Sequence, residues 1–168
     1  MFSSAVSSGV LVDQYDHSTS SIIKKSTNFF KNRFYLSQTE SVFLDFKRKT
    51  FPNLAISKHV NLHAYLKEKN KVELMKLLSY PLYENFKGII KQNDQSSLES
   101  YCLYPEISDA AILQSRIYNA SKSGVSSSLS WHQVTVKFYT ENKEFVNVFE
   151  RREIDNISED QWRICYLE

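Results

Sequence analysis

Two histidines, His59 and His63, stand four residues apart, a spacing that places both imidazoles on one face of a helix. Such a pair can bind zinc, but a zinc site needs further protein ligands, and position 60 is Val where an HExxH motif has Glu. Cys102 and Cys165 are too far apart in sequence for a CxxC zinc site. We therefore expect ordinary surface or core histidines, two buried thiols, no metal and no cofactor.

A second pair, Asp109 and His132, has the residue types of a general acid and base. The two side chains would meet only if both faced the inside of a curved sheet, and Asp109 also fits a turn before a strand. With three glycines, the chain has no P-loop, GxGxxG or GxSxG motif. We expect no catalytic site.

The strongest chemical pattern is cationic. In the segment 22–33, four cations are interleaved with Phe29 and Phe30, a mixture that suits RNA because phosphates bind cations and unpaired bases stack on rings. A helix that packs its phenylalanines on the core would explain the same pattern and is compatible with RNA binding. The residues expected to contact RNA are Lys24, Lys25, Lys31, Arg33, Lys47, Arg48, Lys49 and Lys58.

The charge distribution agrees with a polyanionic partner for the first half of the chain. Residues 1–91 carry 14 Lys and Arg against 7 Asp and Glu, whereas residues 92–168 carry 7 against 12. The net charges, +7 and −5, give the overall +2. Solvated lysine-rich helices would produce the same asymmetry, so charge alone leaves both explanations open.

The first 21 residues are rich in serine and weakly patterned, which is typical of a flexible arm. The first twelve lack acids, as mitochondrial presequences do, but also lack arginine, so a presequence, a mature terminus and neither stay open alternatives. We expect a basic, partly extended arm over 1–36 and one domain over 37–168.

Helical patterns occupy the first part of that domain. Ser37 and Glu40 form a capping box, which predicts a helix that starts at Ser37 and ends in the basic triplet 47–49 before Pro52. Three further helices are expected over 55–69, from Val72 to Leu78, and from Pro81 to Ile90.

Strand patterns follow the helices. Residues 130–140 and 145–150 alternate with period two around a short polar turn, 141–143, and predict a long hairpin. Residues 110–120 and 162–166 add a strand on either side in sequence, with a possible short strand near Leu103 and a Ser/Gly turn over 121–130. Helices followed by an antiparallel sheet define the α+β class.

The order of these elements resembles the Tim-forty-four-like domain family over roughly residues 55–168. The resemblance is carried by YLKEKNKVELMKLLSYPLYENFKGIIKQ (65–92), with its Pro81-Leu82-Tyr83 helix start, and by the strands ILQSRIY, WHQVTVKFYT, FVNVFERRE and WRICYLE. It implies a cone-shaped fold like that of nuclear transport factor two, in which helices pack into a curved antiparallel sheet and side chains such as Trp131, Phe138 and Trp162 fill the cone.

The ribosomal branch of this family matches the short chain and basic arm best. That resemblance implies a structural, non-enzymatic protein of the mitochondrial large ribosomal subunit near the tunnel exit, in the matrix. Its partners would be ribosomal RNA, neighbouring large-subunit proteins and the inner membrane or its insertion machinery, with no small-molecule substrate. The alternatives are an inner-membrane import-motor tether and a cone-fold isomerase or dehydratase, whose acid and base would line the cavity.

Overall fold

The computed structural model describes residues 22–93, 95–102, 106–121 and 128–167. The expected flexible arm, residues 1–21, and most of the expected Ser/Gly turn lie outside them. The five helices are α1 (Ile22–Val42), α2 (Phe51–Lys67), α3 (Lys71–Leu77), α4 (Tyr80–Gln92) and α5 (Gln95–Cys102). The strands are β1 (Ile107–Ser121), β2 (Ser128–Thr140), β3 (Glu144–Ile154), β4 (Ile157–Ser158) and β5 (Arg163–Leu167). The predicted α+β class, helices first and antiparallel sheet after, is confirmed.

The sheet is an antiparallel meander in the order β1-β2-β3-β4, with β5 paired to the other end of β3. The predicted hairpin is confirmed: β2 and β3 join through residues 141–143, and Phe138 pairs with Phe145 beside the turn. The predicted last strand is confirmed as β5. Its outer side meets Leu78, and the Ser79 amide donates to the Ile164 carbonyl at 2.8 Å, so the α3–α4 link covers this edge.

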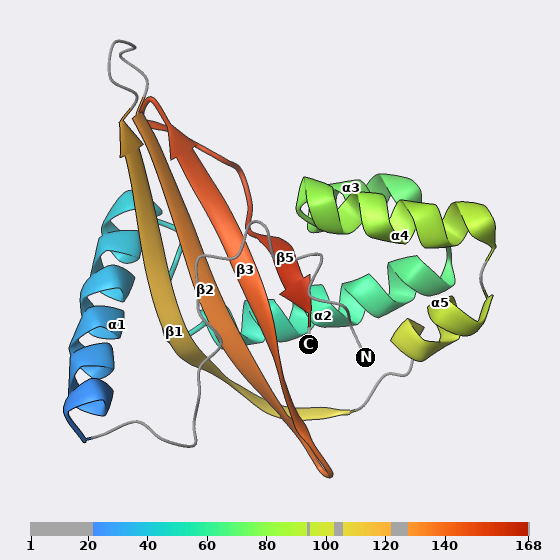
Figure 1. The fold of residues 1–168 in the computed structure, drawn as a ribbon, viewed down its shortest axis with the longest axis horizontal. Coiled ribbons are helices and arrows are strands. Elements are labelled where there is room, and N and C mark those ends of the chain that lie inside the picture. Colours follow the sequence, from blue (N-terminus) through green and yellow to red (C-terminus); the bar gives the residue numbers. More distant parts are fainter. Residues whose placement is uncertain (1–21, 94, 103–105, 122–127, 168) are drawn as a thin grey trace.

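Figure 1 shows α1 alongside β1, α2 crossing one face of the sheet, and α3 and α4 beside β5. The face toward α2 holds an aromatic core that includes Phe43, Phe51, Phe149 and Trp162; Trp162 packs edge-on to Phe43 and Phe51 with ring centroids 5.5 and 5.1 Å apart. Phe138 and Trp162 are buried here, as expected. The same expectation is wrong for Trp131, which alternates with His132 onto the opposite face and donates to Glu150 at 2.8 Å.

Local side chains account for several of the helix ends, including the predicted start at Pro81. Pro81 lies in the first turn of α4, where its missing amide hydrogen costs no helical bond. Asn93 ends α4 in the left-handed conformation (φ 53°), and the Asn70 side chain accepts the Glu73 amide at the start of α3.

Other local signals do not have the predicted structure. Ser37 is not an N-cap, since α1 runs continuously from Ile22 to Val42 through the expected arm–domain boundary. Pro52 does not stop a helix but lies in the first turn of α2, and residues 47–49 lie in the link between the two helices. The possible short strand near Leu103 lies outside the described residues; before it, the chain up to Cys102 forms α5, whose Leu98 is buried.

Candidate nucleic-acid interface

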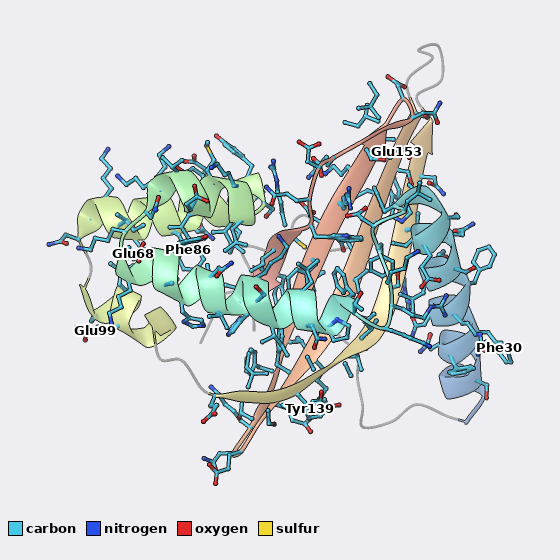
Figure 2. All side chains as sticks on the ribbon, turned by 180° about the vertical axis from the view of Figure 1, so that it is seen from behind. Phe30, Glu68, Phe86, Glu99, Tyr139 and Glu153 are labelled. Carbon is cyan, nitrogen blue, oxygen red and sulfur yellow. The ribbon has the colours of Figure 1, made fainter. Side chains whose placement is uncertain are left out.

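The outward face of α1 carries three exposed aromatic rings. Phe29, Phe30 and Phe34 are 60%, 69% and 60% exposed, values far above those of a core phenylalanine. Figure 2 shows Phe30 pointing away from the sheet. Phe29 and Phe30 meet edge to face with centroids 5.7 Å apart, while Phe34 meets Tyr35 at 5.8 Å. Docking on the core, one of the two explanations for this segment, therefore does not apply to these rings.

The inward face of α1 is held by polar contacts with the sheet. Asn32 donates to the Leu113 carbonyl and accepts from the Ser115 amide, both at 3.4 Å, on the outer edge of β1. The Arg116 guanidinium donates to Asn32 and lies 6.0 Å from the Tyr35 ring centre. These contacts fix the rotation of α1 and so turn its phenylalanines outward.

Cations flank the exposed rings. Lys31 and Arg33 are exposed between and beside the phenylalanines, and Lys24 and Lys25 belong to the first turn of the same helix. The first acidic residue of α1 is Glu40, so eighteen consecutive positions, 22–39, carry four cations and no carboxylate. This stretch has the charge and the aromatic content expected of an RNA contact.

Two of the three cations in the basic triplet, residues 47–49, are accessible to a phosphate group. Lys47 and Lys49 are exposed, but Arg48 forms a bidentate ion pair with Glu40, in which Nη2 lies 2.6 Å from Oε2 and Nε lies 3.0 Å from Oε1. The side-chain hydrogen bond from Arg48 is also the main reason that the pKa of Glu40 lies below its usual value. Of the three cations, Lys47 and Lys49 are therefore the ones available to phosphate.

Lys58 differs from the other expected contacts. It lies on α2, half-buried, and burial together with the nearby Arg151 charge lowers the pKa of its amine. Its proposed phosphate contact stays a prediction, but a partly desolvated lysine beside another cation has less exposed charge to offer than Lys31 or Lys49.

The two helical histidines do come together, as the spacing predicted. Their Nε2 atoms are 2.9 Å apart, and the Nδ1 atom of His59 bonds to the Asn147 carboxamide at 2.8 Å. Burial, followed by the neighbouring His63, lowers the pKa of His59 to about 3, so its imidazole is neutral at pH 7. Among the residues that the structure describes, no three His, Cys, Asp or Glu side chains are grouped as metal ligands.

The Asp109–His132 acid/base pair does not form. His132 pairs with Ile117 across β1, whereas Asp109 pairs with Tyr139 near the other end of β2. The expectation of a turn at Asp109 is also wrong, because the residue lies inside β1. His132 instead has Thr39 Oγ1 at 2.9 Å from Nδ1 and Ser130 Oγ at 2.7 Å from Nε2, and burial lowers its pKa to about 4. A neutral imidazole that is hydrogen-bonded to two hydroxyls can be buried at little cost, so the burial of His132 needs no catalytic explanation.

Two other buried ionisable groups lie on the sheet face that carries Trp131. Burial raises the pKa of Glu150, whose carboxylate accepts from Trp131 and, at 3.2 Å, from Arg152. Burial also raises the pKa of the free Cys165 thiol well above its ordinary value. This confirms one of the two expected buried thiols; the Cys102 side chain lies outside the described part.

Phe34 is the interface residue that the sequence reasoning missed. Its relation to Phe30, four positions earlier, is a helical signal, but it becomes visible only when 22–42 is recognised as one helix.

Comparison of the sequence with protein-family models and with curated proteins finds no match. Within the described ranges, no helix has the length and hydropathy required to cross a membrane.

Proposed function

We propose that this protein is a structural, non-catalytic component of the mitochondrial large ribosomal subunit that binds ribosomal RNA through α1 and the α1–α2 link. The proposal combines the Tim-forty-four-like resemblance, strongest to ribosomal protein L-forty-five, with the interface described above. It places the chain in the matrix, among neighbouring ribosomal proteins and near the inner membrane.

One observation carries the proposal: both carboxylates of α1 and its link, Glu40 and Asp45, are already ion-paired with arginines, so within the described part this surface keeps an excess of exposed positive charge. Lys31, Arg33, Lys47 and Lys49 have exposed side chains, whereas the exposed lysines of α3 and α4 include two that are paired, Lys76 with Glu73 and Lys87 with Glu84. Each cation that neutralises a phosphate releases a counterion, so RNA binding would be strong at low salt and fall steeply as salt rises.

The cone arrangement is part of the same proposal. What supports it is the aromatic side chains that fill the space between α2 and the sheet, with Phe46, Phe138 and Trp162 all at most 2% exposed. A scaffold that presents its outer surface to RNA needs a rigid interior of this kind and no substrate cavity.

Ribosome association tests the proposal directly. A tagged chain with Lys31, Arg33, Lys47 and Lys49 all changed to Ala should leave the large subunit in a sucrose gradient at a lower salt concentration than the unchanged chain. The log–log salt slope should fall by about 0.7–0.9 for each phosphate that is no longer neutralised. A control with four exposed cations removed elsewhere, Lys67, Lys71, Lys91 and Lys143 to Ala, matches the charge change and should sediment normally.

Two results would contradict the proposal. Sedimentation of the unchanged chain away from ribosomal subunits would exclude a ribosomal role, and co-purification with an Hsp70 partner instead would favour the import-tether alternative. Equal release of both four-site variants would show that total charge matters and that the α1 surface has no special part.

A further inference from the structure

Phosphate binding alone does not require the exposed phenylalanines of α1, since cations are sufficient to bind the phosphate backbone of an RNA duplex. We infer that Phe30 and Phe34, together with Phe29, form a stacking site for unpaired RNA bases. The inference rests on the proposed RNA contact and specifies its substrate: single-stranded or looped nucleotides, with duplex RNA held only by charge.

The spacing of Phe30 and Phe34 places both rings on one exposed face of the helix. Residues four apart on a helix have Cβ atoms ~5–6 Å apart, so the two rings are surface neighbours that can each stack one base. Phe30 meets the ring of Phe29 and Phe34 meets the ring of Tyr35, so each of the two central rings is braced by a different neighbour. Exposed rings that already contact a neighbouring ring lose less side-chain freedom when a base stacks on them.

The surrounding charges place the phosphates. Arg33 lies three positions after Phe30, and Lys31 lies three positions before Phe34, so by helical spacing each of these two rings has an exposed cation as a surface neighbour. The nearest carboxylate on the helix, Glu40, is already bound to Arg48. A strand whose bases stack on the rings therefore meets positive charge on the same helix and no carboxylate from positions 22–39.

The composition of the face favours RNA over a lipid surface. The other exposed residues of α1 from position 26 to 41 are polar or charged, including Ser26, Ser37 and Ser41, and the aliphatic Leu36 is half-buried against the core. A helix that lies on a membrane presents a broad apolar face of Trp, Phe or Leu side chains, well separated from its Lys and Arg. Over these positions α1 exposes three apolar side chains, Phe29, Phe30 and Phe34, with Lys31 and Arg33 between them, so the apolar face is narrow and mixed with charge.

Binding of short oligonucleotides to the purified chain tests the inference. The probes are a fluorescent single-stranded RNA, a blunt-ended RNA duplex without a loop, and a single strand of equal charge that lacks bases. The variant is Phe30→Leu with Phe34→Leu, which keeps apolar bulk and removes the rings. Tyr80→Leu on α4 is the matched control, because Tyr80 is an equally exposed aromatic, at 70%.

The double variant should bind the single strand at least about fivefold more weakly, with affinity for the duplex and the base-free strand unchanged, and Tyr80→Leu should change nothing. Unchanged affinity for the single strand, or an equal drop on the base-free strand, would overturn the stacking site. Tight binding of the unchanged chain to phosphatidylserine vesicles, kept in the double variant and without any preference for the single strand, would reassign the face to lipid. Ribosome association through the four cations is measured separately, so failure of stacking leaves the proposed function standing.

Discussion

The imidazole of His59 and the carboxamide of Asn147 are joined by a 2.8 Å hydrogen bond that ties α2 to β3 inside the core. Both residues are buried, at 6% and 0% exposure, and the imidazole packs against the rings of Phe138 and Phe145, with centroids 5.2 and 5.0 Å away. The polar pair is therefore enclosed by aromatic side chains, where an unpaired nitrogen would be costly.

Removal of the carboxamide should weaken the fold. Asn147→Ala deprives the His59 Nδ1 atom of this hydrogen bond and opens a small cavity, for an expected decrease of about 2–4 kcal/mol in the free energy of unfolding. Urea denaturation measures this decrease. Asn61→Ala on the exposed side of α2 is the control and should leave the urea midpoint within error; a similar change in both variants would show that the hydrogen bond contributes little.

The two buried histidines should make the protein sensitive to acid. The folded-state pKa values of His59 and His132, about 3 and about 4, lie below the ordinary 6.5 because of burial. The unfolded chain then binds more protons below pH 6.5, so stability is complete above that value and declines as pH falls toward 4 and then 3. Each histidine contributes a slope of up to ~1.4 kcal/mol per pH unit.

The comparison of variants isolates this effect from other groups. Burial raises the pKa of Glu150, which gives stability the opposite dependence, with stability decreasing as pH rises through the window just above 4.5. Because Glu150 is present in both proteins, the difference in urea midpoint between the unchanged chain and His59→Gln should shrink as pH falls from 7 to 5. A difference that stays constant would show that His59 titrates normally in the folded state.

How far the sequence predicts this molecule differs between its two halves. The sheet was predictable because apolar and polar residues alternate along β2 although both of its faces are buried. Val134, Val136 and Phe138 are apolar, and the residues between them, Gln133 and Thr135, are polar but buried as well. The first helix was not, because Ser37 and Glu40 satisfy the capping pattern while Glu40 binds Arg48 instead. Which phenylalanines face solvent depends on how α1 docks on the sheet, through Asn32 with β1 and Thr39 with His132, and no local pattern encodes interactions between residues so distant in sequence.

The ion pair of Arg151 and Asp45 fastens the α1–α2 link to β3. One Arg151 nitrogen donates to both carboxylate oxygens at 2.8 Å, Nε donates to the Glu159 carbonyl, and the guanidinium lies 4.5 Å from the Phe43 ring centre. The arginine side chain is 7% exposed but that of Asp45 is 66% exposed, so solvent screens part of the attraction.

Removal of the carboxylate should therefore cost a moderate amount. Asp45→Ala is expected to lower the free energy of unfolding by about 1–2 kcal/mol, and Arg151→Met by more, because the latter also removes the bond to Glu159 and the packing on Phe43. A double-mutant cycle measures the coupling. Lys76→Ala, which breaks an exposed pair on α3, serves as control and should leave the urea midpoint unchanged; a coupling that vanishes in the cycle would contradict the assigned ion pair.

The hydrogen bonds between Asn32 and the edge of β1 should determine how firmly α1 is held against the sheet. An edge strand has backbone groups that no neighbouring strand pairs, and Asn32 occupies those of Leu113 and Ser115. Asn32→Ala should speed hydrogen exchange of the Ser115 amide and of α1 while leaving amides in the central β2–β3 pairing protected, because the substitution removes hydrogen bonds at the sheet edge alone. Asn53→Ala, at an exposed position of α2, is the matched control. Since these hydrogen bonds help to orient the outward face of α1, Asn32→Ala should also weaken single-strand RNA binding without any change to the rings or cations. Unchanged exchange at Ser115 would show that the other contacts of α1, such as that of Thr39 with His132, are sufficient to hold it.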